Sequence, residues 1–106
     1  MMNFQNTYTP IPLGLTIARS THGHGIFATS DIKAGVFLGV THIWEQNRRD
    51  WIRTPLGGFI NHNEDPNCFI STNIHYHDGD QRELYAVRPI SEGDEILIYY
   101  TMSQYE

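Results

Sequence analysis

Two short stretches carry polar groups spaced so that they could hold a small ligand. In "GHG", Gly23 and Gly25 leave no Cβ on either side of His24, so main-chain N–H and C=O groups could approach a ligand closely. In "NH", Asn61 offers two hydrogen-bond donors and one acceptor on a rigid amide, next to His62. A plain hairpin turn would also explain the first stretch, and a structural histidine beside a turn would explain the second.

A third stretch, "ILIYY", ends an apolar segment with two adjacent tyrosines, Tyr99 and Tyr100. Neighbouring side chains of a strand point to opposite faces, so only one of the two hydroxyl groups can face a reacting centre. Two tyrosines of a hydrophobic core would give the same pattern. Each stretch on its own therefore leaves a purely structural interpretation open.

Cysteine and histidine chemistry is less favoured by the sequence. Cys68 is the single cysteine, which excludes a disulfide within the chain and a cysteine-based zinc cage, and we expect it to be a small buried hydrophobic residue. The residues that could bind a metal ion are His22, His24, His75, His77, Glu64 and Asp65. Because no spacing among them converges on four ligands, we expect no metal site.

Length and composition indicate one small domain. The chain has 106 residues, of which 40% are hydrophobic, and no apolar run approaches the length of a membrane-spanning helix. Seven Lys and Arg against twelve Asp and Glu give a formal net charge of -5, which argues against nucleic-acid binding and is compatible with a basic peptide partner. The N-terminal sequence lacks the pattern of a secretory signal. We therefore expect a cytoplasmic protein that is not secreted.

These residues must be positioned by short strands, because the sequence alternates apolar and polar residues and has many turn signals. Strands are predicted near residues 15–18, 25–28, 36–43, 59–60, 69–75, 83–88 and 95–99. One helix is predicted from Trp44 to about Thr54, since Trp44, Arg48 and Trp51 have helical spacing and Pro55 would end it. The result is a single, mainly β domain over residues 1–106.

Three fragments in this order resemble the motifs of the SET-domain protein lysine methyltransferases. They are "HGHGIFATSDIKAG", "GGFINHNEDPNC" and "LYAVRPISEGDEILIYY", and the resemblance covers about Leu15 to Tyr100. Each fragment alone is a weak signal, whereas all three at compatible spacing are specific. The resemblance implies a fold of several small β-sheets, similar to a β-clip, with one short helix and a C-terminal pseudoknot. The chain is similar in size to the small viral members of the family.

The resemblance also implies S-adenosylmethionine as the methyl donor. By analogy with the family, the residues expected to bind this cofactor are Gly23, His24, Gly25, Phe27, Asn61 and His62. The main chain of His62 would pair with the adenine edge, and the Asn61 side chain would contact the amino-acid portion of the donor. Asn67, in the turn after the motif, is expected to satisfy main-chain groups.

Alignment of "GDEILIYY" on the last family motif places Tyr100 on the catalytic tyrosine. Tyr99 falls where the family has a small or acidic residue. The candidates for the substrate channel are Trp51, Phe59, Ile70, Tyr85, Ile98, Tyr99 and Tyr105. In the family a Phe or Tyr at the channel end limits the number of methyl groups, and the corresponding positions here are Ile98 and about Ile70. The resemblance thus implies products beyond monomethyl-lysine.

We therefore expect an enzyme that transfers a methyl group from S-adenosylmethionine to a lysine ε-amine. The alternative is a non-catalytic SET-like module that binds a peptide or the cofactor. The expected partner is a lysine-containing protein or peptide, with a histone or another basic protein among the possibilities, and neither a membrane nor nucleic acid. Similarity to the small viral members implies a homodimer, and a viral origin would place the protein inside the host cell.

Overall fold

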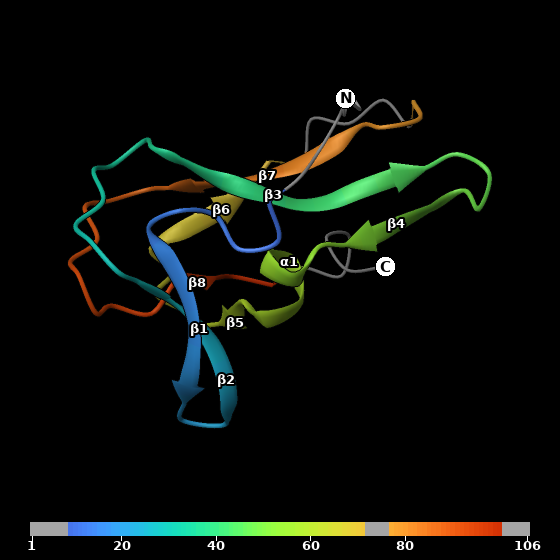
Figure 1. Ribbon diagram of the computed structural model, residues 1–106. Helices are drawn as coiled ribbons and strands as arrows, with labels where there is room; N and C mark the ends of the chain where they lie inside the picture. The colour runs from blue at the N-terminus through green and yellow to red at the C-terminus, as the bar shows by residue number, and fades with distance from the viewer. Residues whose placement is uncertain (1–8, 72–76, 101–106) are drawn as a thin grey trace, which may run out of the picture.

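Eight short strands and one short helix make up the regular structure of residues 9–71 and 77–100, which the computed structural model describes. In chain order they are β1 (Leu15–Ser20), β2 (Gly23–Ala28), β3 (Phe37–Glu45), β4 (Asp50–Arg53), α1 (Pro55–Phe59), β5 (Asn61–His62), β6 (Cys68–Ile70), β7 (Gln81–Ala86) and β8 (Leu97–Ile98). Figure 1 shows how they are arranged. The fold is mainly β, as the sequence predicts.

The strands form three small sheets. β1 and β2 are an antiparallel hairpin, β4-β3-β7-β6 is a four-stranded antiparallel sheet, and β5 pairs with β8. β3 runs along the middle of the larger sheet, beside β7 (Figure 1). Its register with β7 shifts at two places, where the strand carries a β-bulge or irregularity. Such shifts bend a strand and increase its twist.

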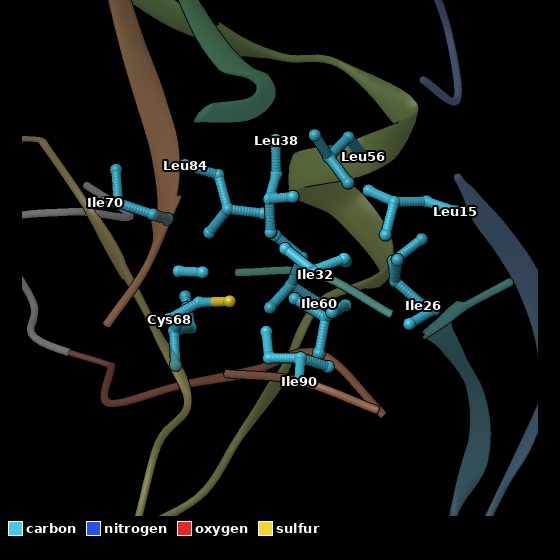
Figure 2. Packing of buried hydrophobic residues seen from close by; sticks show 14 residues of the cluster. Leu15, Ile26, Ile32, Leu38, Leu56, Ile60, Cys68, Ile70, Leu84 and Ile90 are labelled. Atoms are coloured by element: carbon cyan, nitrogen blue, oxygen red, sulfur yellow. The ribbon is translucent and has the colours of Figure 1, made fainter. Parts of the chain in front are cut away.

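The hydrophobic core lies between these sheets and the helix. Figure 2 shows how side chains from distant parts of the sequence meet there, with Leu56 of α1 beside Leu15 and Leu38. The fourteen buried members of this core cluster are Leu15, Ile26, Ala28, Ile32, Leu38, Leu56, Ile60, Cys68, Ile70, Leu84, Ala86, Ile90, Ile96 and Ile98. Burying a side chain of this size contributes roughly 1.5–3 kcal/mol. The cluster takes residues from every helix and strand of the described residues except β4 and β5.

The helix predicted from Trp44 to Thr54 is wrong. The structure has an antiparallel hairpin there, in which Trp44 of β3 lies opposite Trp51 of β4 and the two rings are 5.5 Å apart. Two residues seven apart lie on the same face of a helix, two turns from each other. They can also lie opposite each other in a hairpin with a four-residue turn, as Trp44 and Trp51 do. Arg49 in that turn has φ 52°, which no α-helix accommodates. Pairing of β3 with both neighbours overrides the local pattern.

The helix of the described residues lies just after this hairpin. Thr54 caps it, with its hydroxyl accepting a hydrogen bond from the Gly57 N–H at 3.3 Å, and Pro55 occupies the start of the first turn. A Cβ at Gly57 would overlap the carbonyl oxygen of Thr41, so the helix lies directly against β3. Phe59 ends this helix, and the strand predicted at Phe59–Ile60 therefore begins at Asn61 instead.

The pair β5–β8 joins the "NH" stretch to the C-terminal segment. It is parallel, with Asn61 opposite Leu97 and His62 opposite Ile98. The Asn67 side chain extends this connection, because it accepts a hydrogen bond from the Leu97 N–H at 2.9 Å and donates one to the Glu95 carbonyl at 2.8 Å. Asn67 thus satisfies main-chain groups as expected, and it holds the approach to β8 in place.

The remaining expectations on the elements concern strand lengths and membranes. The predicted strand at residues 69–75 is observed as β6, Cys68–Ile70, and residues 72–76 lie outside the described part of the chain. The predicted strand at 83–88 is β7, which begins two residues earlier than predicted and also ends two residues earlier. In the described residues, α1 is too short to cross a lipid bilayer.

Candidate active site

A pocket of about 460 Å³ lies where the tip of the β1–β2 hairpin faces the β5–β8 pair. This volume is in the range of small-molecule sites, which measure roughly 300–1,000 Å³. The pocket is lined by Ser20, Thr21, His22, Asn61, His62, Asn63, Glu95, Leu97 and Tyr100. It therefore brings the "NH" stretch and Tyr100 of "ILIYY" together with residues 20–22, whereas Gly23, His24 and Gly25 of the "GHG" stretch do not line it.

Asn61 is held in one orientation by two acceptors. Its amide nitrogen donates a hydrogen bond to the main-chain oxygen of His24 at 3.1 Å and another to Oε2 of Glu95 at 2.7 Å. Both N–H hydrogens therefore have protein acceptors, and the amide oxygen is the group that Asn61 can offer to a ligand. A ligand that binds this oxygen must carry a hydrogen-bond donor.

Glu95 is a site residue that the sequence did not single out. Its carboxylate accepts hydrogen bonds from the Ser20 hydroxyl and from Asn61, both at 2.7 Å. The preceding acid, Asp94, instead accepts a hydrogen bond from the Ser91 N–H within its own turn. The "GDE" motif marks both acids but not which one faces the pocket, because that depends on the bridge between Phe27 and Glu95.

The two glycines of "GHG" have different surroundings. A Cβ at Gly25 would overlap Oε2 of Glu95 and lie 3.0 Å from the amide nitrogen of Asn61, so this glycine makes room for the contact between them. Gly23 has φ +98° and open space around it, so it serves the turn conformation. His24 is exposed, and its ring lies 6.4 Å from that of Phe59. Phe27 does not line the pocket, although it lies on the same hairpin.

His62 links the motif to the C-terminal tyrosines. Its Nδ1 accepts a hydrogen bond from the Tyr100 N–H at 2.9 Å. Its ring lies 4.9 Å from the ring of Tyr99 and 5.4 Å from that of Tyr100. Because Nδ1 accepts this bond, it carries no proton, and the histidine places Tyr100 at the pocket wall.

Tyr100 differs from Tyr99 in its surroundings. Tyr100 lines the pocket, and its hydroxyl donates a hydrogen bond to the main-chain oxygen of Ile60. Partial burial raises the pKa of Tyr100 above its ordinary value, while Arg53 acts in the opposite direction. The hydroxyl is therefore protonated at neutral pH. Tyr99 is 54% exposed and does not line the pocket, so Tyr100 is the one of the two tyrosines that lies at the pocket.

The candidates for the substrate channel are dispersed. Trp51 packs in a separate cluster, with Trp44 beside it and the Arg82 guanidinium 4.4 Å from its ring centre. Ile70 and Ile98 belong to the core cluster and are 2% and 1% exposed. Phe59 lies at the end of α1 and is partly exposed. Tyr105 lies outside the described residues.

Tyr85, another predicted channel residue, does not line the pocket. It lies on the face of the four-stranded sheet away from the core, since its neighbours Leu84 and Ala86 are buried in the core cluster. Its ring stacks 5.5 Å from that of Phe69, and its hydroxyl donates a hydrogen bond to Glu83 at 2.9 Å. Strand alternation therefore turns Tyr85 away from the pocket.

Cys68 does not line the pocket. Burial raises the pKa of the Cys68 thiol to about 12, so it is protonated and unreactive at neutral pH. Within residues 9–71 and 77–100, His, Cys, Asp and Glu form no cluster of three that could hold a metal ion. A larger hollow of about 650 Å³ lies between residues 12–15 and the start of β3, but it contains none of the predicted site residues.

Comparison with known proteins was made for the sequence and for the structure. The family model of the SET domain matches residues 41–101, which is more than half of the chain. A SET and MYND domain-containing protein of Dictyostelium discoideum is 48% identical over 46 residues, which are 43% of this chain and 12% of that protein. The chain thus spans about an eighth of the length of this curated relative.

Solved structures share the fold. A Plasmodium falciparum protein classed as a histone methyltransferase superposes with a TM-score of 0.68 and 22% identity, over 88% of this chain and 97% of that one. A Polycomb Repressive Complex 2 from Chaetomium thermophilum, a humanized mutant bound to an inhibitor, superposes with a TM-score of 0.64 and 18% identity. That match covers 84% of this chain and 15% of the other. These likenesses concern the fold.

Proposed function

This chain belongs to the SET-domain family, and we propose that it is an S-adenosylmethionine-dependent protein lysine N-methyltransferase. One observation carries the proposal. The parallel pair β5–β8 brings Asn61, Glu95 and the Tyr100 side chain to one pocket. A donor-binding amide and a tyrosine hydroxyl at a single small site are what this reaction requires.

The polar groups of the pocket fit the cofactor. S-adenosylmethionine, when bound, supplies a methyl group on a sulfonium sulfur together with an α-ammonium group. The Asn61 amide oxygen can accept a hydrogen bond from an ammonium, and the Glu95 carboxylate beside it favours positive charge. We assign Asn61 to the amino-acid portion of the donor and the main chain at His62 to its adenine edge.

Tyr100 orients the incoming amine. A free lysine amine has a pKa of roughly 10.4, so the site must present it in the neutral form, and a cation nearby together with desolvation lowers that pKa. The Tyr100 hydroxyl donates to the Ile60 carbonyl, and a hydroxyl oxygen can also accept a hydrogen bond from an amine or a weak contact from a methyl group. Because the tyrosine is protonated, rate comes from alignment rather than from a strong base.

The substrate class follows from charge. The formal net charge of -5 favours a basic, lysine-bearing protein over nucleic acid, and a histone is one such substrate. We further propose that the protein works as a homodimer inside the cell, in the cytoplasm or, for a virus-encoded protein, in the host. A domain of this size buries a modest share of its surface and gains core by association.

The proposal is tested with the labelled cofactor and a panel of basic proteins. We expect incorporation of label into lysine, and we expect Asn61→Ala to weaken calorimetric cofactor binding by roughly tenfold to a hundredfold, because a hydrogen bond to a charged group is lost. Cofactor binding without any transfer to the panel would favour the non-catalytic module. A folded, ligand-free wild-type protein that gives no binding heat would refute the proposal.

A further inference from the structure

The carboxylate of Glu95 connects three parts of the pocket. It accepts a hydrogen bond from Ser20 at the end of β1 and another from Asn61 in β5, and its own main chain leads into β8. The two bonds are 2.7 Å long and use one carboxylate oxygen each. Hydrogen bonds to a carboxylate are roughly twice as strong as those between neutral groups.

This arrangement fixes which end of the Asn61 amide faces the pocket. Both neighbours of the amide nitrogen, the Glu95 carboxylate and the His24 carbonyl, can only accept hydrogen bonds. Turning the amide by half a rotation would set its oxygen against these two acceptors. Glu95 and the His24 carbonyl therefore hold the amide oxygen on the side away from themselves, where it is available as a hydrogen-bond acceptor.

The first motif is shaped to admit this carboxylate. A Cβ at position 25 would overlap Oε2 of Glu95 and approach its carboxyl carbon to 3.0 Å, so Gly25 leaves the space that Glu95 occupies. Gly25 is itself buried in β2. The backbone of one motif and a side chain of another thus fit together at the contact with Asn61.

We propose that Glu95 is a positioning residue that makes this end of the pocket select an ammonium group. It acts through Asn61, whose oxygen it presents as an acceptor, and through its own negative charge. A cofactor lacking the α-amino group would lose the interaction, whereas its adenosine portion would bind as before. This inference rests on the proposed function, because it assumes that the methyl donor occupies the pocket.

The test compares two ligands in calorimetric titrations. S-adenosylhomocysteine carries the α-amino group, and its deaminated analogue is otherwise the same molecule. We expect Glu95→Gln to lower the affinity for S-adenosylhomocysteine about tenfold and to change the affinity for the analogue less than about twofold. The matched control is Glu92→Gln, which removes the same charge from an exposed turn and should change neither affinity.

A purely structural role would give a different result. If Glu95→Gln lowered the affinity for both ligands equally, or for neither, the proposal that Glu95 selects the ammonium group would be refuted. If this variant failed to fold in a thermal melt, Ser20→Ala would decide, because it removes the other partner of the carboxylate and should weaken only the amine-bearing ligand. If the wild-type protein bound neither ligand, the proposed function itself would be refuted. The titration of the wild-type protein alone gives this result, so the two failures can be told apart.

Discussion

Tyr100 is fixed at both ends, through its main-chain bond to His62 and its hydroxyl bond to Ile60. Tyr100→Phe removes only the hydroxyl, so we expect cofactor affinity to stay within about twofold while turnover falls by tenfold or more, as for the loss of one interaction made near the transition state. Tyr99→Phe is the matched control and should retain most activity. Single-turnover transfer to a peptide measures both, and a reversed ranking would assign the reactive hydroxyl to Tyr99.

By resemblance to the family, the residues at positions 98 and 70 are expected to decide the number of methyl groups. Ile98 and Ile70 are both aliphatic and buried, so neither can hold a partly methylated amine by a hydrogen bond. We predict dimethyl-lysine or a higher product with excess cofactor, read from the intact mass of a peptide substrate. Accumulation of the monomethyl product alone would contradict this.

A variant of Ile98 extends the test of product number. Ile98→Tyr should shift the product toward monomethyl-lysine, because the ring would bring a hydroxyl to the position that limits methylation in the family. Since Ile98 is fully buried in β8, we expect the larger ring to cost about 1–3 kcal/mol of stability by overpacking. The melting temperature must therefore be measured together with the product.

At the scale of the element, α1 is the support from which β5 emerges, and its two glycines are not equivalent. A Cβ at Gly57 would overlap the main chain of Thr41, whereas nothing lies within 4 Å of a Cβ at Gly58. We expect Gly57→Ala to lower the free energy of unfolding by about 1–3 kcal/mol. Gly58→Ala should raise it by roughly 0.5 kcal/mol, because alanine favours helix. Urea unfolding would show equal effects if α1 were not packed against β3.

The sequence predicted elements well where the pattern had one structural meaning. The alternation of apolar and polar residues predicted most of the strands, and the three motifs predicted the family. The prediction for Trp44 to Thr54 was wrong because the spacing of its aromatic residues suits a helix and a hairpin equally. The pairing of β3 with β7 decides between the two. Glu95 could not be chosen over Asp94, since only the tertiary bridge to Phe27 turns one acid toward Asn61.

At the scale of the whole molecule, one buried histidine links stability to pH. Burial lowers the pKa of His42 to about 4, and the nearby Arg82 and Arg53 add to this. The folded pKa lies below the unfolded value of roughly 6.5, so the stabilisation is complete above pH 6.5 and is lost as pH falls toward 4. The loss amounts to about 3 kcal/mol.

The prediction for His42 is measured by urea unfolding at a series of pH values. The wild-type protein should lose stability between about pH 6.5 and 4, whereas His42→Gln should show a flatter dependence in that range because its side chain does not titrate. Because the substitution also changes the packing around position 42, the slopes of stability against pH are compared rather than the absolute stabilities. If the stability of the wild-type protein and that of the variant fell with the same slope, the loss of stability in acid would come from other groups.

Association is the second prediction at this scale. The chain has a mass of 12.2 kDa, and so small a domain gains buried surface by pairing. We expect light scattering at micromolar concentration to give twice this mass for the active protein. If a sample with the mass of a single chain transferred methyl groups, the domain would work as a monomer.

The length and position of the strand pair β5–β8 affect when it forms during folding and how readily it opens. It is only two residues long, and it joins position 61 to position 97, so it forms after a long loop has closed and few hydrogen bonds hold it. Such a pair can open locally while the larger sheet remains intact. A ligand that contacts both Asn61 and Tyr100 bridges the two sides and raises the cost of opening in proportion to the logarithm of its concentration. The supply of methyl donor would thus govern how long the chain stays closed around its own active site.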